Sequence, residues 1–439
     1  MIQAAANLLF MPWVVGVLLL GGLILTIRTR AVQVRRFRDA WRAAFLLPSA
    51  QGTGALTPFQ AFMTALAASV GTGNIAGVAT AIVSGGPGAL FWIWVYGFFA
   101  MSIKFAEAVL GVSFRDTRAG SVLSGPMYYL RDGLKSPFLA WLFALVAAVA
   151  ALTTTPFTQP NSIALVINSV FGVSKLVAGI VIAVLTWLVI IGGIQSIGRV
   201  VAKLSPLKVG LYLVGGLIVI VMNAGQLPAI LGLIFREAFS LRSVAGGSLG
   251  VFVAMRYGIA RGIYANEAGY GTAAVAYGTA RSTQPVQQGL NAIVEVFIVS
   301  FVTSTISALT ILLTGVWQSG LTSTAAVAAG FNTSIPVVGG WIVAFCTFLF
   351  GYTTLIGWAY YGEQFFEYIL GRRVTVPYRW IYCLLIPFGA ITRVDVVWAW
   401  GDLMNALQVF PNLVGLVGLS GLVAAAARTQ ASDVTPQHQ

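Results

Sequence analysis

The sequence predicts an all-α polytopic membrane protein, and its composition and its apolar runs support this fold class. Hydrophobic residues occupy 58% of the 439 positions and charged residues only 8%, with a mean hydropathy of +0.89. Soluble domains carry roughly 25% charged residues, so a soluble globule is excluded. Apolar runs of about 18 or more residues recur along the chain, each long enough to cross a ~30 Å hydrocarbon core as a helix. They lack the polar–apolar alternation of barrel strands.

We predict eleven transmembrane helices, with boundaries uncertain by several residues. The predicted spans are 8–28, 56–84, 88–113, 136–157, 174–194, 206–224, 246–276, 287–315, 336–368, 378–393 and 401–427. The first span has no basic region before it and no small-residue cleavage site, and Arg28 and Arg30 follow it. We therefore interpret it as a retained helix rather than a secretory signal.

The distribution of positive charge predicts the orientation in the membrane. The net charge is +13, but Lys and Arg are scattered through short loops, which disfavours nucleic-acid binding. Loops on one side of the predicted spans hold most of them: Arg28, Arg30, Arg35, Arg36, Arg38, Arg42, Arg115, Arg118, Arg131, Lys135, Arg199, Lys203, Lys208, Arg281, Arg372, Arg373, Arg379 and Arg428. The opposite side holds Lys175, Arg236, Arg242 and Arg393. The positive-inside rule then places the N-terminus outside and the C-terminus in the cytoplasm.

The residues needed for enzyme chemistry are missing from the sequence. Cys346 and Cys383 lie inside apolar runs, and the single histidine, His438, lies in the polar C-terminal tail. A nucleophile with a base or a metal cluster is therefore not available, and we expect no enzyme activity.

Ten spans remain when the peripheral first helix is set aside, and they divide into two sets of five. Because five is odd, the second set is inserted upside down relative to the first, as in the inverted repeats of many secondary transporters. We predict a peripheral helix and basic connector at 1–55, one repeat at 56–225, a second at 226–428, and a cytoplasmic tail at 429–439. The connector at 29–55 suits either a helix on the inner leaflet or a solvated loop.

The leading helix of the first set contains the sequence Val70-Gly71-Thr72-Gly73-Asn74. Glycine costs roughly 1 kcal/mol against alanine inside a helix, so this segment is expected to break it. Amides from Thr72 to Asn74, at the start of the second half-helix, would face an anion such as a carboxylate. Carbonyls before the break, near Ala67, Ser69 and Val70, suit a hard cation. The alternative is a tight helix crossing, since small residues let helices pack closely in lipid.

The leading helix of the second set is also breakable and is unusually polar. It contains Gly258, Gly262, Gly269 and Gly271 together with Arg256, Arg261 and Glu267. Buried charges need partners, and these three could pair with one another or with other helices, either as a gate or as a structural clamp.

Other polar residues in apolar spans allow a functional or a structural interpretation. Thr353 and Thr354 could form a weak cation site or bond back to the preceding turn. Gln159, in a polar turn with Pro160, could bind a substrate or cap a helix. Lys104 and Glu107 are spaced for an intrahelical pair. Glu295 is the most isolated intramembrane acid, and it is either a candidate proton site or an acid that reaches water near the start of its span.

Several motifs in order resemble the alanine or glycine:cation symporter family. They are Gly71-Thr72-Gly73-Asn74-Ile75-Ala76-Gly77, Gly85-Gly86-Pro87-Gly88-Ala89, Lys104-Phe105-Ala106-Glu107-Ala108, Gly125-Pro126-Met127-Tyr128-Tyr129, Asn266-Glu267-Ala268-Gly269 and Gly357-Trp358-Ala359-Tyr360-Tyr361-Gly362-Glu363. The resemblance covers nearly the whole chain. It implies the leucine-transporter fold with one additional N-terminal helix, and Na⁺-coupled import of alanine, glycine or a similar small neutral amino acid across a bacterial inner membrane.

The resemblance also implies the residues of the site. The substrate carboxylate would meet the break at Gly71, Thr72, Gly73 and Asn74, and the pocket would be completed by Phe157, Gln159 and the region from Ile259 to Ile263. The co-transported Na⁺ would bind the carbonyls of Ala67 and Val70 and the hydroxyls of Thr353 and Thr354.

One departure from the family concerns the ion. Members commonly have an aspartate near the position of Val299 and a small residue near Glu295, so the acid here is displaced by about one helical turn. Proton coupling is therefore the alternative to sodium. A passive channel is a more remote alternative, because the sequence has no pore-lining ring signature.

Overall fold

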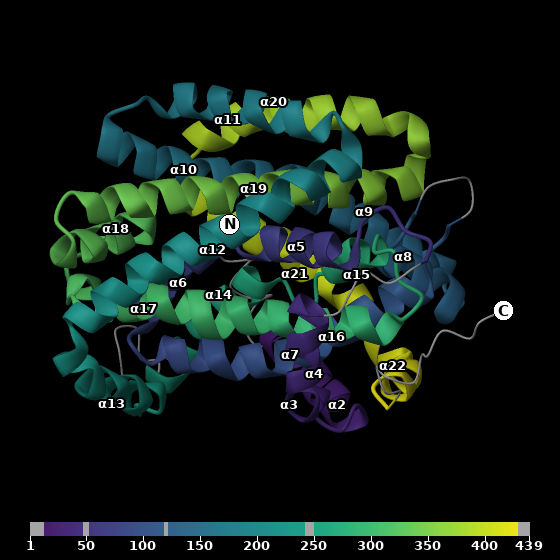
Figure 1. Ribbon diagram of the computed structural model, residues 1–439, viewed down its shortest axis with the longest axis horizontal. Coiled ribbons are helices and arrows are strands. Elements are labelled where there is room, and N and C mark those ends of the chain that lie inside the picture. Colours follow the sequence, from purple (N-terminus) through teal and green to yellow (C-terminus); the bar gives the residue numbers. More distant parts are fainter. Residues whose placement is uncertain (1–12, 47–51, 118–121, 242–249, 429–439) are drawn as a thin grey trace.

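The computed structural model describes residues 13–46, 52–117, 122–241 and 250–428 (Figure 1). His438, the tail at 429–439, the first residues of the span predicted at 8–28, Arg118 and Arg242 lie outside this part of the chain. Within it the structure is helical, without a β-strand, apart from the isolated bridges Leu56–Ala280 and Asp116–Leu123. The all-α prediction is confirmed.

The first broken helix begins at α5 (Pro58–Ser69), where Thr57 and Gln60 form a capping box. After α5 the chain unwinds at Val70 and Gly71, makes a short turn of 3₁₀ helix, η2 (Thr72–Asn74), and continues as α6 (Ala76–Gly85). The two halves are bent by 55°. The predicted break therefore lies at the predicted glycines.

Long apolar helices surround this element, and most of them run in a similar direction in Figure 1. They are α7 (Ala89–Ser113), α9 (Pro137–Thr153), α10 (Thr155–Phe171), α11 (Lys175–Ile190), α12 (Gly193–Met222), α16 (Pro285–Phe297), α17 (Ser304–Leu313), α19 (Val338–Leu370) and α20 (Thr375–Ile391). A stretch of π-helix, η6 (Ile298–Thr303), joins α16 to α17. In Figure 1, α11 and α20 form one outer layer and α7 and α16 lie toward the opposite side.

The second broken helix consists of α14 (Gly250–Asn266) and α15 (Thr272–Gly278). Three residues between them have positive φ angles: Glu267 (57°), Gly269 (94°) and Gly271 (81°). A left-handed conformation is uncommon for a residue with a Cβ atom, so the glutamate at this turn is a conformational outlier.

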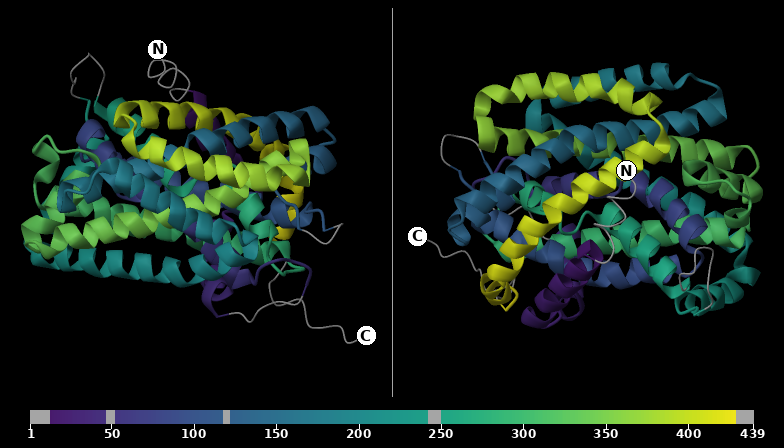
Figure 2. Two further views of the ribbon diagram at one scale, coloured as in Figure 1. Left: turned by 90° about the horizontal axis from the view of Figure 1, so that it is seen from above. Right: turned by 180° about the vertical axis from the view of Figure 1, so that it is seen from behind.

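The remaining helices are several at the ends and edges of the bundle together with α21, which packs against α9 and α10. They are α2 (Val15–Arg28), α3 (Val32–Arg35), α4 (Phe37–Phe45), α8 (Pro126–Tyr128), α13 (Leu227–Ala238), α18 (Ser323–Ser334), α21 (Val394–Gly418) and α22 (Ser420–Ala426), with short turns η4 (Tyr129–Gly133), η5 (Ala224–Gln226), η7 (Val316–Gln318) and η8 (Arg372–Val374). The yellow α21 crosses the molecule diagonally in the right-hand view of Figure 2. The connector after the first span contains α3 and α4, and Phe37 of α4 packs against Phe297 at 5.0 Å.

Two predicted boundaries are wrong. The span at 136–157 does not end at the polar turn, because α10 continues to Phe171 with Pro160 inside it, and the combined helix is 35 residues long. The loop expected between 194 and 206 is helical, since α12 starts at Gly193. Lys208, which we assigned to a cytoplasmic loop, therefore lies in the middle of a helix and is fully buried.

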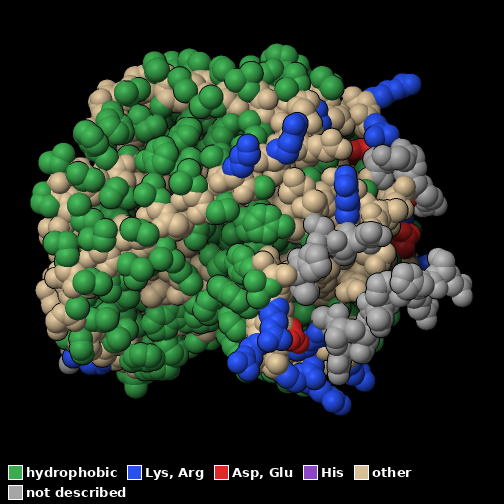
Figure 3. Space-filling view, viewed as in Figure 1, with side chains coloured by type: hydrophobic (Ala, Val, Ile, Leu, Met, Phe, Trp, Pro, Cys, Tyr) green, Lys and Arg blue, Asp and Glu red, His purple; other side chains and the backbone are tan. Residues whose placement is uncertain are grey.

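The surface is that of a membrane protein. The described residues include six helices long and apolar enough to cross a membrane, or eight if each of two bent pairs is one span. The count of eleven stays a prediction, because α2 and α11 are shorter apolar helices. Figure 3 shows hydrophobic side chains over most of one face, with Lys and Arg gathered mainly toward the end where α3 and α4 lie.

Candidate functional site

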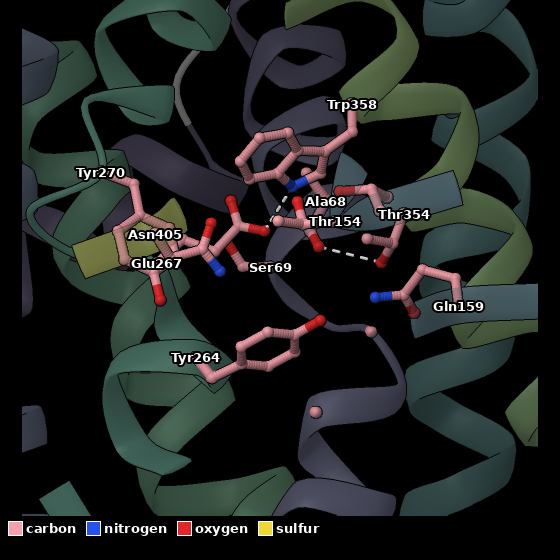
Figure 4. Close-up of a pocket in the computed structure, with 13 residues that line it drawn as sticks. Ala68, Ser69, Thr154, Gln159, Tyr264, Glu267, Tyr270, Thr354, Trp358 and Asn405 are labelled. Atoms are coloured by element: carbon pink, nitrogen blue, oxygen red, sulfur yellow. Dashed lines mark hydrogen bonds between the residues drawn. The ribbon is translucent and has the colours of Figure 1, made fainter. Parts of the chain in front are cut away.

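A small polar pocket lies where the two broken helices meet α10, α19 and α21 (Figure 4). Its lining residues are Ala68, Ser69, Gly71, Gly73, Thr154, Thr155, Gln159, Tyr264, Glu267, Tyr270, Thr354, Trp358 and Asn405. The centre of a water-sized molecule can occupy about 10 Å³ of it. This is room for about one water molecule, so a larger ligand would have to displace the surrounding side chains.

The backbone at the first break presents hydrogen-bond donors to side-chain oxygens. Oε1 of Gln159 accepts hydrogen bonds from the Thr72 amide at 3.1 Å and from the Thr72 hydroxyl at 2.9 Å. The Gly71 amide donates to Oδ1 of Asn74 at 3.2 Å. The unwound segment therefore offers N–H and O–H groups that already bind carbonyl-type oxygens, as expected for a segment that receives a carboxylate.

Asn74 itself faces away from the pocket and holds the break in place. Its amide nitrogen donates to the carbonyl oxygen of Val299 at 3.3 Å and to the hydroxyls of Thr303 at 3.2 Å and Ser304 at 3.4 Å. These contacts anchor η2 to η6 and α17, so the Asn74 side chain positions the break from behind.

The glycines of the break are required by close neighbours. A Cβ atom on Gly71 would lie 2.6 Å from Oγ1 of Thr354, and one on Gly73 would lie 2.8 Å from Cδ1 of Tyr264. Contacts below 3.0 Å force neighbouring atoms to move. Gly71 and Gly73 therefore bring α19 and α14 close to the unwound backbone.

The oxygens predicted to bind Na⁺ converge at the end of α5. The Thr354 hydroxyl donates to the carbonyl oxygens of Ala67 at 3.1 Å and Ala68 at 2.9 Å. The Thr353 hydroxyl lies 3.3 Å from the Ala67 oxygen. The structure thus brings together residues that are about 285 positions apart in the chain.

A lysine ammonium, which we did not predict there, contacts this group of oxygens. Nζ of Lys208 donates to the carbonyl oxygen of Ala67 at 3.1 Å, the carbonyl oxygen of Val70 at 2.5 Å and Oγ1 of Thr353 at 2.5 Å. Two unit charges about 4 Å apart repel by about 4 kcal/mol at an effective dielectric constant of about 20. A sodium ion on the same oxygens would therefore be opposed by the Lys208 charge.

Glu267 supplies the acid of the pocket. One carboxylate oxygen accepts a hydrogen bond from Nε1 of Trp358 at 2.6 Å and the other from Oγ1 of Thr272 at 3.0 Å. The pairing considered between Arg261 and Glu267 is wrong, because Arg261 bonds to Asp402. Sequence reasoning missed Glu267 as a pocket residue, although an intramembrane acid at a helix break is a signal for one.

Five residues expected in the substrate pocket are not among those that line it: Thr72, Asn74, Phe157, Ile259 and Ile263. Ile259 and Ile263 are fully buried on α14, whereas the nearby Tyr264 and Tyr270 line the pocket. Phe157 lies against α20, since a Cβ atom on Gly389 would come 2.5 Å from its Cα atom. The tyrosines could not be chosen from the sequence because the second break could not be placed to within one residue.

A second polar cluster lies behind the pocket and connects to it through Ser69. Lys104 forms a buried ion pair with Glu295 at 2.7 Å, and both groups contact the Ser69 hydroxyl. The expected Lys104–Glu107 pair is wrong, because Oε1 of Glu107 accepts from the amides of the second break and from Asn412. Glu295 therefore has a cationic partner and is not an isolated acid.

The Arg261–Asp402 pair lies beside the pocket wall formed by Tyr264. Both side chains are largely buried, at 9% and 13% exposure. The guanidinium carbon of Arg261 lies 5.0 Å from the ring centre of Trp398, which in turn packs 4.8 Å from the Tyr264 ring. The pair thus links α14 to α21 next to Tyr264.

Comparison with known proteins identifies the family. The family model described as the sodium:alanine symporter family matches residues 1–437. The chain belongs to this family. It is 39% identical over 422 residues to the sodium/alanine symporter AgcS of Methanococcus maripaludis, covering 94% of this chain and 92% of that relative. It is 33% identical to the putative sodium/proton-dependent alanine carrier protein YrbD of Bacillus subtilis, covering 93% of this chain and 87% of YrbD.

Solved structures show the same fold at low sequence identity. The crystal structure of MhsT in complex with L-phenylalanine matches with a TM-score of 0.61 and 13% identity, covering 86% of this chain and 99% of MhsT. The symporter-family chain therefore has the predicted leucine-transporter fold. It is a multi-pass membrane transporter and not an enzyme.

Proposed function

We propose that this transporter imports a small neutral amino acid, alanine or glycine, by cation-coupled alternating access in a bacterial inner membrane, with its N-terminus outside. The observation that carries the proposal is the charge pattern of the pocket. Backbone donors at Gly71 to Gly73 and the Glu267 carboxylate line the same small space. An amino-acid zwitterion would place its carboxylate against the backbone donors and its ammonium group against Glu267.

The carboxylate would bind where side-chain oxygens now accept hydrogen bonds. Oε1 of Gln159 and Oδ1 of Asn74 accept from the amides of Thr72 and Gly71. The start of α6 adds the positive end of a helix dipole. We assign carboxylate binding to Gly71, Thr72, Gly73 and Gln159, with Asn74 as the residue that fixes their geometry.

The size of the substrate follows from the pocket walls. Trp358, Tyr264 and Tyr270 are large side chains around a space of about 10 Å³ for the centre of a water-sized molecule. A bulky side chain on the substrate would displace these rings. Alanine and glycine are the amino acids that demand the least movement.

Sodium is the first candidate for the coupled ion. The family and AgcS are named for sodium and alanine, and we propose that Na⁺ drives transport. The group Ala67, Val70, Thr353 and Thr354 provides oxygens of the kind a hard cation binds. The contact between Lys208 and three of these residues favours a second candidate, the proton.

Uptake of labelled alanine into proteoliposomes tests the proposed substrate. Unlabelled alanine and glycine should compete with the label, whereas phenylalanine and lactate should not, since one is too large and the other lacks the ammonium group. Equal competition by lactate would contradict the role of Glu267, and saturation with counterflow would exclude a channel.

A further inference from the structure

Lys208 is buried in the middle of α12 and points at the unwound end of α5. An ammonium group has three N–H donors and no acceptor. The three acceptors within reach are the carbonyl oxygens of Ala67 and Val70 and the hydroxyl oxygen of Thr353. The number of donors equals the number of acceptors, and the arrangement therefore fits the charged form of the side chain.

The elements packed around Lys208 contain few other charges. Helices α5, α17 and α18 have no acidic or basic residue. On α19, the centre of the Phe350 ring lies 5.3 Å from the ammonium nitrogen, and the acids Glu363 and Glu367 pair with Arg379 and Arg372. Lys175 is the first residue of α11.

One acidic group acts on Lys208 across the break. The Glu267 carboxylate interacts electrostatically with the ammonium, and Glu267 lines the pocket. Titratable hydroxyls nearby are engaged elsewhere, since Tyr212 bonds to Ser307 and Tyr352 to the Leu185 carbonyl oxygen. The ammonium of Lys208 is thus the cation that the oxygens of the break contact directly.

We propose that Lys208 is a built-in cation that replaces Na⁺ at the oxygens of Ala67, Val70 and Thr353, and that its contacts with these oxygens hold the first broken helix in its substrate-binding shape. This inference rests on the proposed function for its link to amino-acid uptake. These three contacts join α12 to the unwound end of α5 and to α19.

Two consequences distinguish this arrangement from a sodium site. In the unaltered protein Lys208 occupies these oxygens, so the Na⁺ proposed to drive transport would bind elsewhere. Removal of the side chain exposes a set of carbonyl and hydroxyl oxygens that a sodium ion can fill. A Lys208→Ala substitution should therefore create a response to sodium, whereas Lys208→Met, which fills the space without a charge, should not.

The test uses purified full-length protein and needs no amino acid. Thermal unfolding is measured in NaCl and in choline chloride of equal ionic strength, for the unaltered protein, Lys208→Ala, Lys208→Met and the control Lys203→Ala, an exposed lysine of the same helix. We expect Na⁺ to raise the midpoint of Lys208→Ala more than that of the other three. The proposal is overturned if Lys208→Ala responds no more than the unaltered protein, or if Thr354→Ala removes a sodium response from the unaltered protein.

Labelled alanine binding gives the second readout. We expect Lys208→Ala to bind alanine weakly in choline and about 5- to 150-fold more tightly in Na⁺, the usual range of coupling between two ligands. If no variant binds alanine or glycine, the proposed substrate fails while the unfolding measurement still decides the role of Lys208.

Discussion

Oε1 of Gln159 lies 3.1 Å from the amide nitrogen and 2.9 Å from the hydroxyl oxygen of Thr72. This double contact joins α10 to the unwound turn of the first broken helix, 87 positions away in the chain. At this point the donors of the unwound backbone meet an acceptor oxygen.

Replacing Gln159 with leucine removes the acceptor for both donors of Thr72. Leucine also removes the amide group that we assign to the substrate carboxylate, and hydrogen bonds to charged groups contribute about 1.5–3 kcal/mol, so we expect roughly a 10-fold or greater fall in alanine affinity. Labelled alanine binding measures it. Gln195→Leu, at an exposed position of α12, is the control and should bind alanine normally. Unchanged affinity in Gln159→Leu would contradict the role of Gln159.

A methyl group on Gly71 would collide with the Thr354 hydroxyl, 2.6 Å from the added carbon. Overpacking of this kind costs typically about 1–3 kcal/mol, and here it separates α19 from the break. We expect Gly71→Ala to lose most alanine uptake while remaining inserted in the membrane. Gly210→Ala is the matched control, because nothing lies within 4 Å of a Cβ atom there. Normal uptake by Gly71→Ala would show that the close approach is dispensable.

Glu267→Gln tests the proposed contact with the substrate ammonium. The substitution keeps the shape but removes the negative charge, and hydrogen bonds to charged groups contribute about 1.5–3 kcal/mol. Alanine affinity should therefore fall roughly 10- to 100-fold. Glu237→Gln, on the partly exposed helix α13, should leave affinity unchanged. Equal affinity of the two variants would place the ammonium elsewhere.

The Lys104–Glu295 pair should stabilise the fold more than it serves transport. Both side chains are essentially unexposed, at 1% and 0%, and removing one partner of a buried pair costs about 3–5 kcal/mol. We expect Lys104→Met and Glu295→Gln each to lower the thermal midpoint strongly. The double variant should recover part of the loss. If the loss of stability in the double variant equals the sum of the two single losses, the two residues do not act as a pair.

The sequence predicted what depends on local chemistry. Glycines at 71 and 73 weaken a helix wherever it lies, so the first break was placed correctly, and the family motifs predicted the fold. The convergence of Thr353 and Thr354 on Ala67 followed from the resemblance to that family.

The sequence did not predict contacts between distant helices. We assigned Lys208 to a loop because we ended one predicted helix at residue 194 and began the next at 206, whereas α12 is helical from Gly193 onward. The carbonyl oxygens that Lys208 contacts belong to residues about 140 positions away in the chain. The same limit explains the wrong partner assigned to Lys104 and the choice of partners left open for Arg261. The acidic partners of these two residues are Glu295 and Asp402, which lie on helices far away in the chain. No local sequence pattern indicates which distant helices pack together.

Concentrative uptake of labelled alanine into proteoliposomes, with an inward Na⁺ gradient, an inward proton gradient or neither, tests the central claim most directly. The account predicts accumulation above equilibrium with an imposed cation gradient, and none without one. It also predicts loss of this accumulation in Gly71→Ala but not in Gly210→Ala. Uptake that only equilibrates under every gradient, or that Gly71→Ala retains in full, would contradict a cation-coupled transporter whose site is the broken helix at Gly71.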